Sequence, residues 1–407
     1  MKTITRLRRR YPGEFMLKLV RQPLAFLLEV SRRGPAHAFG LGKFQVAIVN
    51  QPELIHQVLV TDSANYTKGR GLEVAQRLLG QGLLTSENPL HKSQRHLLQP
   101  IFQPRNLARF QPVVEEKTSD LLKHWPEQGT ICASTEMTRL TLEIIAQTVF
   151  GAEVDVGEVR EVMEEAVEVF RLAALPLYEW AEMLIPPLKK RALRVRQRLD
   201  AVLTRVLEQK QSLLQDANMS PEQLRDEAMT LFLAGHETTA HALTFALYLL
   251  SRHPEEQELV RRDEGGQRLK AALLETLRLY PTAWMIGRRS IETCTLGEYS
   301  LPSQTTVMMS PYVMHRQPEF FPDPDEFRPQ RWLDRPRNTL PKGAYFPFGA
   351  GPRVCIGEHF AWMEMQSGLQ AILKNFRLEP CPVDHPELRP GITLAPGEEL
   401  AIPVQRL

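Results

Sequence analysis

Hydrophobic residues recur three and four positions apart along most of this chain, which is the spacing of one face of an α-helix. The pattern runs from His91 to Leu214, where prolines interrupt it. A second helical stretch opens with Ser-Pro-Glu-Gln at Ser220, a capping box with proline at the first helical position. This stretch continues to about Arg252, so it predicts a helix roughly 48 Å long, which could cross a whole domain.

Shorter patterns predict the remaining elements. Helices are expected at Phe15–Val30, Pro52–Val60, Arg268–Tyr280 and Glu358–Asn375, and a short strand at Val46–Val49. The segment Tyr66–Pro89 is rich in glycine and predicts a long functional loop with at most a turn or two of helix. Together the patterns predict one mainly α-helical domain over residues 1–407, with small β-sheets near 40–60, 290–310 and 385–405.

Composition and charge narrow the class of protein. Of the 407 residues 43% are hydrophobic and 24% charged, and 50 Lys and Arg against 48 Asp and Glu leave a formal net charge of +2. This balance excludes an acidic disordered chain and does not favour nucleic-acid binding. The 4 cysteines form no CxxC pair, which argues against a zinc ribbon, an iron–sulfur cluster or a disulfide scaffold and is typical of a reducing cytoplasm.

No segment is expected to cross a membrane. The basic start and the apolar Phe15–Val30 superficially resemble a signal peptide, but charges interrupt the apolar run and no small-residue cleavage site follows. The longest apolar stretch, Ala228–Leu250, contains His236, Glu237 and His241, which would be costly in lipid. We therefore expect a soluble, cytoplasmic protein in which this stretch is a buried core helix.

The sequence from Phe346 to Gly357 combines three glycines with a cysteine directly before a predicted helix. Cys355 would lie at the helix N-terminus, where free N–H groups and the positive end of the helix dipole favour a thiolate. Arg353 adds a positive charge two residues earlier. A single thiolate presented in this way suits the axial position of one iron ion, although an isolated cysteine in a Gly/Pro loop is more often a free thiol.

The pattern Phe348-x-x-Gly351-x-Arg353-x-Cys355-x-Gly357 resembles the haem-ligand signature of the cytochromes P-450, the haem-thiolate monooxygenases, at every defined position. The resemblance extends over essentially the whole chain. It implies a single, mainly α cytochrome P-450 fold that encloses haem b between the long helix and the helix after the cysteine. It also implies that Cys355 is the proximal iron ligand, whose thiolate favours O–O cleavage, and that the haem is contacted by Phe348, Gly349, Arg353 and Gly357.

The long helix carries the sequence Ala-Gly-His-Glu-Thr-Thr, starting at Ala234. An acid beside a hydroxyl in an otherwise apolar helix is costly unless it has a function, although it could also be a capped polar patch. A zinc protease is disfavoured, because the zincin motif spaces its histidines four apart and His236 and His241 are five apart. The cytochrome P-450 resemblance implies that Thr238 hydrogen-bonds bound oxygen, that Glu237 helps to deliver protons and that Ala234 belongs to the haem site.

Further charged residues gain a role through the resemblance. Glu275 and Arg278 lie three apart on one predicted helix face, and Arg331 ends a Phe-x-Pro-x-Arg segment. The family pattern implies that these three residues form a buried ion-pair network that braces the cysteine loop.

Haem also brings two carboxylates, which need cations. The residues implied for this role are His91 and Arg95, four apart on one helix, together with Arg288 and Arg353. Arg289 could take the place of Arg288, and each base alone could be a solvated side chain.

The substrate-facing regions of the family correspond to apolar segments here. They supply Leu83, Leu84, Phe170, Leu177, Trp284, Met285, Ile286 and Leu394, roughly half of which could simply pack the core. This lining predicts a large hydrophobic substrate. The overall pattern is most similar to thermophilic bacterial carotenoid-ring hydroxylases, with fatty acids and terpenoids as further candidates. The connection from Ser251 to Arg268 is shorter than in family members, which carry an additional helix there, and this is compatible with a thermophilic origin.

The resemblance implies O2 as co-substrate and electrons from a separate ferredoxin or flavodoxin with its reductase, because no flavin or ferredoxin module is attached. A monomer with no nucleic-acid partner is expected. Two alternatives remain open: a peroxygenase driven by hydrogen peroxide, and a non-catalytic haem-thiolate protein that binds ligands. The acid–threonine pair at Glu237 and Thr238 argues against both.

Overall fold

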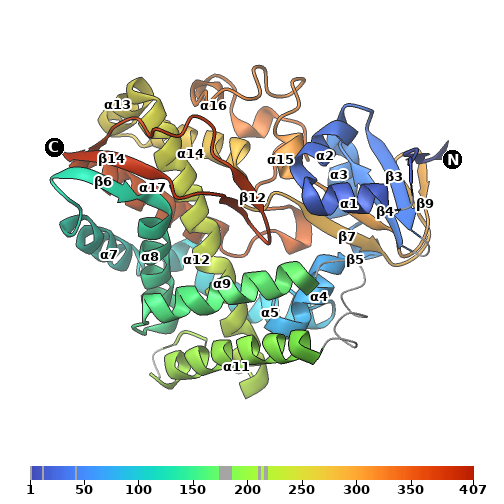
Figure 1. The fold of residues 1–407 in the computed structure, drawn as a ribbon, viewed down its shortest axis with the longest axis horizontal. Coiled ribbons are helices and arrows are strands. Elements are labelled where there is room, and N and C mark those ends of the chain that lie inside the picture. The colour runs from blue at the N-terminus through green and yellow to red at the C-terminus, as the bar shows by residue number, and fades with distance from the viewer. Residues whose placement is uncertain (1, 12, 42–43, 174–185, 210–211, 215–218) are drawn as a thin grey trace.

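The structure is a computed structural model that describes all residues except 1, 12, 42–43, 174–185, 210–211 and 215–218. Figure 1 shows helices filling most of the molecule, with the larger β-sheet and the N-terminal helices gathered at one end. This arrangement confirms the predicted mainly helical fold with small sheets.

The helices, in chain order, are α1 (Glu14–Arg21), α2 (Pro23–Ser31), α3 (Pro52–His56), α4 (Arg70–Leu79), α5 (Leu90–Leu98), α6 (Pro104–Leu107), α7 (Gln111–Lys123), α8 (Ala133–Ile145), α9 (Val156–Ala173), α11 (Pro186–Glu208), α12 (Pro221–Arg252), α13 (Pro254–Arg262), α14 (Gln267–Leu279), α15 (Pro311–Met314), α16 (Gln330–Asp334) and α17 (Glu358–Asn375).

The strands of the described residues form four sheets. The largest has the order β2 (Thr5–Arg6), β3 (Ala36–Leu41), β4 (Phe44–Val49), β10 (Thr306–Met309), β7 (Ile286–Ser290) and β5 (Tyr66–Lys68). The smaller sheets join β1 (Lys2–Thr3), β9 (Tyr299–Leu301) and β8 (Cys294–Leu296); β11 (Phe376–Leu378), β14 (Ala401–Arg406) and β6 (Gln128–Cys132); and β12 (Leu388–Pro390) with β13 (Leu394–Pro396). In the largest sheet β5 is paired with β7, so Lys68 lies opposite Arg288.

Helix α12 confirms the prediction of one long helix. The hydroxyl of Ser220 accepts a hydrogen bond from the N–H of Gln223 at 3.2 Å, and the Gln223 side chain accepts one from the N–H of Ser220 at 3.3 Å. This reciprocal capping box starts the helix, and it ends at Arg252, two residues before a proline. Despite the apolar character of α12, none of the helices described is both long and apolar enough to cross a membrane.

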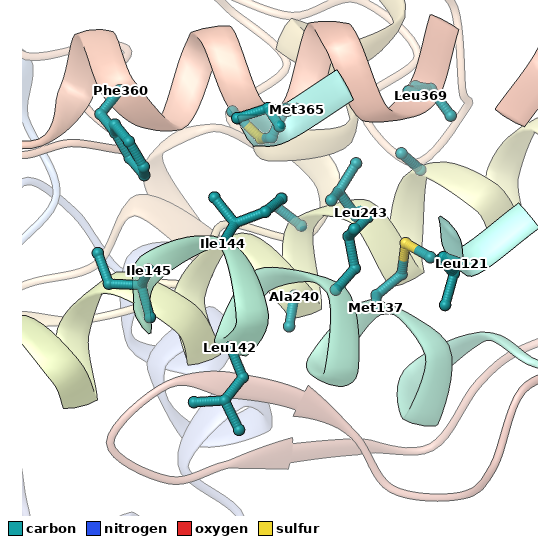
Figure 2. Close-up of a cluster of buried hydrophobic side chains, with 14 of the residues drawn as sticks. Leu121, Met137, Leu142, Ile144, Ile145, Ala240, Leu243, Phe360, Met365 and Leu369 are labelled. Carbon is teal, nitrogen blue, oxygen red and sulfur yellow. The ribbon is translucent and has the colours of Figure 1, made fainter. Parts of the chain in front are cut away.

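Helix α12 packs against α8 and α17 in the core of the molecule. Figure 2 shows part of this cluster, with side chains from four helices: Leu121 of α7; Met137, Leu142, Ile144 and Ile145 of α8; Ala240 and Leu243 of α12; and Phe360, Met365 and Leu369 of α17. Because α17 follows directly on the cysteine loop, this packing holds the loop in a defined position relative to α12.

Two predictions for the first hundred residues were wrong. The apolar segment predicted as one helix forms two, α1 and α2, because Pro23 starts a new helix and Gln22 before it has a φ of −143°. The segment predicted as a loop contains α4, which is 10 residues long. Its glycines lie at the ends of the helix and do not prevent it: Gly69 precedes α4, Gly71 lies in the first turn, and Gly80 ends the helix with a φ of +75°.

The connection between α12 and α14 also differs from the expectation, because it contains the additional helix α13 despite its short length. Pro254 occupies the first turn of α13, acidic residues follow it, and Arg261 and Arg262 lie in the last turn. These charges stabilise a short helix through its dipole. Strand β6 had no counterpart in the prediction either.

Candidate functional site

The middle of α12 has one face that neighbouring elements cover only in part. Ala234, Glu237, Thr238 and His241 each keep part of their surface accessible, whereas every residue from Ala242 to Ser251 is buried. These four positions are spaced three and four residues apart and therefore share one side of the helix. The predicted acid–threonine pair thus lies on an accessible face of an otherwise buried helix.

Contacts with α8 hold this part of α12 in place. The hydroxyl of Thr141 donates a hydrogen bond to the carbonyl oxygen of His236 at 3.1 Å. A Cβ atom at Gly235 would lie 3.0 Å from Cδ1 of Ile145, so the absence of a side chain allows the two helices to approach closely. On the other side, the hydroxyl of Thr238 donates to the carbonyl oxygen of Ala234 at 2.8 Å, and this bond orients the side chain.

The carboxyl of Glu237 contacts a residue that the sequence did not indicate. The hydroxyl of Thr393 donates a hydrogen bond to Oε1 of Glu237 at 2.8 Å and lies 3.2 Å from Nδ1 of His241. Burial raises the pKa of Glu237, and the Thr393 hydrogen bond opposes this rise. Burial also lowers the pKa of His241 to about 4, so its ring is neutral at neutral pH.

The loop before α17 presents Cys355 through two glycines in the left-handed region. Gly349 and Gly351 have φ values of +73° and +71°, which other residues rarely adopt. A Cβ atom at Gly351 would also overlap the carbonyl oxygen of Leu59, so the loop packs directly on the π-helical segment Gln57–Thr61 that continues α3. The N–H of Cys355 donates to the carbonyl oxygen of Phe348 at 2.9 Å and closes the loop.

The ionisation of Cys355 differs from the prediction. Burial raises the pKa of its thiol to about 11, and the N–H of Gly357 and the charge of Arg95 oppose this rise without cancelling it. The lost hydration and the charge of Glu358 thus favour the neutral thiol more than the N–H of Gly357 and Arg95 favour the thiolate. The protein around the sulfur is dense enough to desolvate it, yet the side chain keeps exposed surface. A metal ion could therefore reach the sulfur, and coordination deprotonates a thiol.

Basic side chains gather beside the cysteine loop. We call this set the cation group; it consists of Lys68, His91, Arg95, Arg288 and Arg353. Lys68, His91 and Arg288 are all buried. Burial, reinforced by the neighbouring cations, lowers the pKa of Lys68 to about 7, of His91 to about 4 and of Arg288 to about 10. Arg95 connects the group to the loop through a hydrogen bond to the carbonyl oxygen of Val354 at 2.8 Å.

The cation group carries more positive charge than its acidic neighbours neutralise. In the described part of the chain, the acids that act on it are Glu87, which pairs with Arg353, and Glu227, whose pKa burial raises to about 7. Buried like charges are unfavourable without counter-ions, so the group fits a ligand with two carboxylates. Haem b is such a ligand: the cation group would hold its carboxylates and Cys355 would bind its iron. The residues present therefore fit the haem that the resemblance implied.

The structure separates Arg288 from Arg289. Successive residues of a strand point to opposite faces of a sheet. Arg288 of β7 is buried, and the charge of Arg353 contributes to its lowered pKa. Arg289 points the other way and forms an ion pair with Glu73 at 3.0 Å, in which both side chains are partly exposed. Only Arg288 of the two belongs to the cation group.

A second set of charges surrounds one carboxylate. We call it the Glu275 group; it consists of Glu275, Arg278, Arg331 and Trp332. The Glu275 carboxylate accepts hydrogen bonds from Nε and Nη2 of Arg278 at 2.8 and 2.9 Å, Nε of Arg331 at 2.9 Å, Nε1 of Trp332 at 2.8 Å and the N–H of Arg328 at 2.9 Å. Glu275 and Arg278 are completely buried. The three residues that the resemblance grouped are thus in direct contact.

The Glu275 group is linked to the cysteine loop through His315, which the sequence did not indicate. Nη1 of Arg278 donates to the carbonyl oxygen of His315 at 3.0 Å, and the N–H of Phe346 donates to Nε2 of His315 at 3.0 Å. Burial lowers the pKa of His315 well below its usual range, so the ring stays neutral and Nε2 remains an acceptor. The first residue of the cysteine loop is therefore tied to the buried charges.

The predicted substrate residues lie in separate apolar clusters. Leu83 and Leu84 pack with the large cluster around α12. Ile286 lies beside the cysteine loop, where its Cδ1 is 3.7 Å from the position of a Cβ atom at Gly349. Leu177 and the side chain of Phe170 lie outside the described residues.

The remaining predicted substrate residues, Trp284, Met285 and Leu394, pack with the N-terminal helices α1 and α2. Trp284 is 5% exposed and Leu394 0% exposed, so both are buried in this cluster, as Leu83 at 7% is in the large cluster. The indole N–H of Trp284 is satisfied by the carbonyl oxygen of Gly391 at 3.0 Å, which allows the ring to be buried.

Another buried acid, Glu364 of α17, was also missing from the prediction. Neither of its carboxylate oxygens has a hydrogen-bond partner among the described residues. Burial raises the pKa of Glu364 well above its usual range. The nearby hydroxyl of Thr239 of α12 opposes this rise, although its geometry is not that of a well-aligned hydrogen bond. Glu364 lies four residues after Phe360 and four before Gly368, both buried, so an analysis of helix faces would have found it. Lys68 and Thr393 stand in short segments where no periodic pattern marks them.

Comparisons with known proteins relate the chain to one family. The family model for cytochrome P450 matches residues 15–399. The chain is 33% identical to cyclooctatin synthase of Streptomyces melanosporofaciens, over 96% of this chain and 93% of that protein. It is 29% identical to cyclooctat-9-en-7-ol 5-monooxygenase of the same organism, over 90% and 87%. The crystal structure of CYP175A1 from Thermus thermophilus matches with a TM-score of 0.83 and 32% identity, over 99% of this chain and 100% of that chain.

Proposed function

The chain belongs to the cytochrome P450 family and is a haem-dependent monooxygenase, and we propose that it hydroxylates a large hydrophobic isoprenoid, with a carotenoid ring as the first candidate. The observation that carries the proposed site is the cation group, whose positive charge is not neutralised, beside an accessible cysteine. An arrangement of this kind is unfavourable in the protein alone and becomes favourable with a bound dianion.

In this proposal Cys355 binds the haem iron, and Phe348, Gly349 and Gly357 shape the loop around it. The bound haem supplies oxygen activation, which a thiolate ligand promotes by raising the electron density at the iron. His91, Arg95, Arg288 and Arg353 hold the haem carboxylates, and Lys68 joins them as a further cation. The Glu275 group has a structural role, because it ties the start of the cysteine loop to α14 through His315.

Glu237 and Thr238 supply protons on the accessible face of α12. Because burial raises the pKa of Glu237, its carboxyl holds a proton closer to neutral pH than a solvated glutamate does. The Thr238 hydroxyl donates a hydrogen bond to the carbonyl oxygen of Ala234, so the lone pairs of its own oxygen are free to accept a hydrogen bond. An acid that can donate a proton next to a hydroxyl that can accept a hydrogen bond forms a two-residue relay.

The substrate class rests on apolar character and on the relatives. Leu83, Leu84, Met285 and Ile286 offer no polar group that would fix a small polar molecule. The names of the two Streptomyces relatives favour a cyclic terpenoid as the second candidate, and a fatty acid is the third. A titration with a carotenoid, a cyclic diterpene and a fatty acid, followed by the spin-state shift of the haem spectrum, would rank these classes.

Electrons come from a separate ferredoxin or flavodoxin with its reductase, and the protein works as a cytoplasmic monomer. Lys342 supports docking of an acidic partner, since it is exposed in the segment that leads into the cysteine loop. Arg353 does not contribute to such a surface, because it is turned inward and pairs with Glu87.

The absorption spectrum of the reduced protein with carbon monoxide tests the site. We expect a strongly red-shifted Soret band, the mark of a thiolate opposite carbon monoxide. Cys355→Ala should abolish this shift, whereas the control Cys132→Ala, at a partly buried thiol in another segment, should keep it. A histidine-like band in the parent protein would refute the ligand assignment, and a protein that binds no haem would refute the whole proposal.

Turnover with a reduced ferredoxin and O2 tests the reaction. We expect hydroxylated product and a strict requirement for the electron donor, while Thr238→Ala should keep haem and lose the coupling of electron use to product. Efficient turnover with hydrogen peroxide and none with the electron donor would favour the peroxygenase alternative. Substrate binding without turnover under either condition would favour a non-catalytic ligand-binding protein.

A further inference from the structure

Thr393 connects two polar residues of α12 to a turn near the end of the chain. Its hydroxyl donates to Oε1 of Glu237 at 2.8 Å and lies 3.2 Å from Nδ1 of His241. A hydroxyl has one proton to donate and two lone pairs to accept with. Since its proton is directed to Glu237, Nδ1 of His241 must carry the hydrogen in this arrangement. The result is a directed chain of hydrogen bonds from His241 through Thr393 to Glu237.

The backbone around Thr393 holds the hydroxyl in place. The N–H of Gly391 donates to the carbonyl oxygen of Thr393 at 2.9 Å, and the N–H of Leu394 donates to the carbonyl oxygen of Thr282 at 2.9 Å. Trp284 fixes the same turn through its bond to Gly391 at 3.0 Å. The Thr393 side chain, which is buried, therefore sits on a braced turn between β12 and β13.

Glu237 depends on this hydroxyl. In the described structure Thr393 is the only hydrogen-bond donor to the Glu237 carboxyl, and no cation forms an ion pair with it. His241 is neutral, because burial and the charge of His236 lower its pKa to about 4. A largely desolvated carboxyl with a single partner takes its orientation from that partner.

We propose that Thr393 and His241 are positioning residues for Glu237: the Nδ1–H of His241 orients the Thr393 hydroxyl, which holds the Glu237 carboxyl on the face of α12 that carries Thr238. This inference rests on the proposed role of Glu237 as a proton donor. The hydroxyl also stabilises the ionised carboxylate against the cost of burial, so it sets how readily Glu237 gives up and regains its proton.

Infrared spectroscopy of the haem-loaded protein tests the inference without turnover. The C=O band of the protonated Glu237 carboxyl is identified as the band that Glu237→Gln removes, and its intensity is followed against pH. In Thr393→Val the pH at which this band disappears should rise by about one unit, since one hydrogen bond to a charged group is worth about a tenfold change. Thr393→Ser keeps the hydroxyl and should restore the parent value.

Coupling of electron use to product is the second readout. Thr393→Val should lower the coupling several-fold toward that of Glu237→Gln, with the carbon monoxide spectrum unchanged, and the double variant should lose nothing more. Thr393→Ser should recover the parent coupling. If Thr393→Val does not fold, His241→Leu replaces it, because that change removes the Nδ1–H and should shift the infrared titration in the same direction by a smaller amount.

The outcomes separate this inference from the proposed function. If Glu237→Gln loses coupling while Thr393→Val matches the parent in both readouts, the positioning role is wrong and the relay stands. If Glu237→Gln keeps full coupling, the relay is wrong, and the infrared shift alone then decides whether Thr393 holds Glu237. A Thr393→Ser variant that behaves like Thr393→Val would overturn the inference, because it retains the hydroxyl.

Discussion

Arg278 and Arg288 are both buried below the protein surface, and they differ in how their N–H groups are used. All five N–H groups of Arg278 are accounted for by the Glu275 carboxylate and by the carbonyl oxygens of His315, Pro324 and Glu326. Arg288 makes one hydrogen bond, to the carbonyl oxygen of Gly287 at 2.8 Å, in the described structure. The two arginines represent the Glu275 group and the cation group, which both contact the cysteine loop.

The difference teaches how to tell a structural group of charges from a binding site. The Glu275 group satisfies its own hydrogen-bonding capacity, so it needs nothing from outside and stabilises the fold as it stands. The cation group leaves donors of Arg288 unused, and burial together with the repulsion between its charges lowers the pKa of Lys68, His91 and Arg288. Such a group costs stability until an anion binds, and it is therefore suited to bind one.

The largest effect is expected when the Glu275 group is broken. Glu275→Ala leaves Arg278 buried without its counter-ion, which should lower the free energy of unfolding by about 3–5 kcal/mol, measured by urea titration. The control Glu73→Ala breaks the partly exposed ion pair with Arg289 and should cost at most about 1 kcal/mol. Equal losses in the two variants would show that the Glu275 group is no more than an ordinary ion pair.

Removing a cation from the cation group should have an effect on haem and not on folding. In the proposed site Arg288→Leu removes a charge-assisted hydrogen bond to a haem carboxylate, worth about 1.5–3 kcal/mol, so haem affinity should fall about 10- to 100-fold. Haem transfer to an excess of a haem-scavenging protein measures this. The unfolding free energy of the haem-free protein should not fall, because the apolar side chain relieves repulsion. Arg289→Leu is the control, and equal haem loss from it would contradict the assignment.

The pH dependence of stability gives a third test. In the folded, haem-free protein the pKa of Lys68 is about 7, against 10.5 in the unfolded chain, so between these values the unfolded chain binds one more proton. The free energy of unfolding should therefore rise with pH, by at most about 1.4 kcal/mol per unit, and this contribution is lost as the pH falls toward 7. Urea titrations from pH 7 to 9 should show a smaller slope for Lys68→Met. Parallel curves would mean that Lys68 is charged in the folded protein.

The smallest effect is expected at a neutral hydrogen bond next to the Glu275 group. The hydroxyl of Tyr345 donates to the carbonyl oxygen of Leu274 at 2.8 Å, and the ring is buried. Tyr345→Phe should lower the free energy of unfolding by about 1 kcal/mol and leave haem affinity unchanged. A change in haem affinity as large as that in Arg288→Leu would remove the distinction between the two groups.

Several features were predictable because their causes lie within a few residues. The ends of α12 follow from the capping box at Ser220 and the proline after Arg252, and the helix after Gly357 begins where the glycine-rich loop ends. Helix propensity, capping and turn geometry act locally, so the sequence contains them directly. The two segments predicted wrongly lie around Pro23 and Gly80. There a proline begins a helix and a glycine ends one, so neither residue breaks the helical structure of its segment.

The sequence alone determined the family, the cysteine loop, the acid–threonine motif and the main helices, because each depends on residues that are close together in the sequence. Only the tertiary structure decided that Lys68 joins the cation group, that Arg288 and not Arg289 does, and that Trp284 and Leu394 are core residues. It also brought Thr393 to Glu237 across 156 positions of sequence and raised the pKa of Cys355. Burial and hydrogen-bond partners depend on which distant segments of the chain come into contact, and a local sequence pattern does not contain this information.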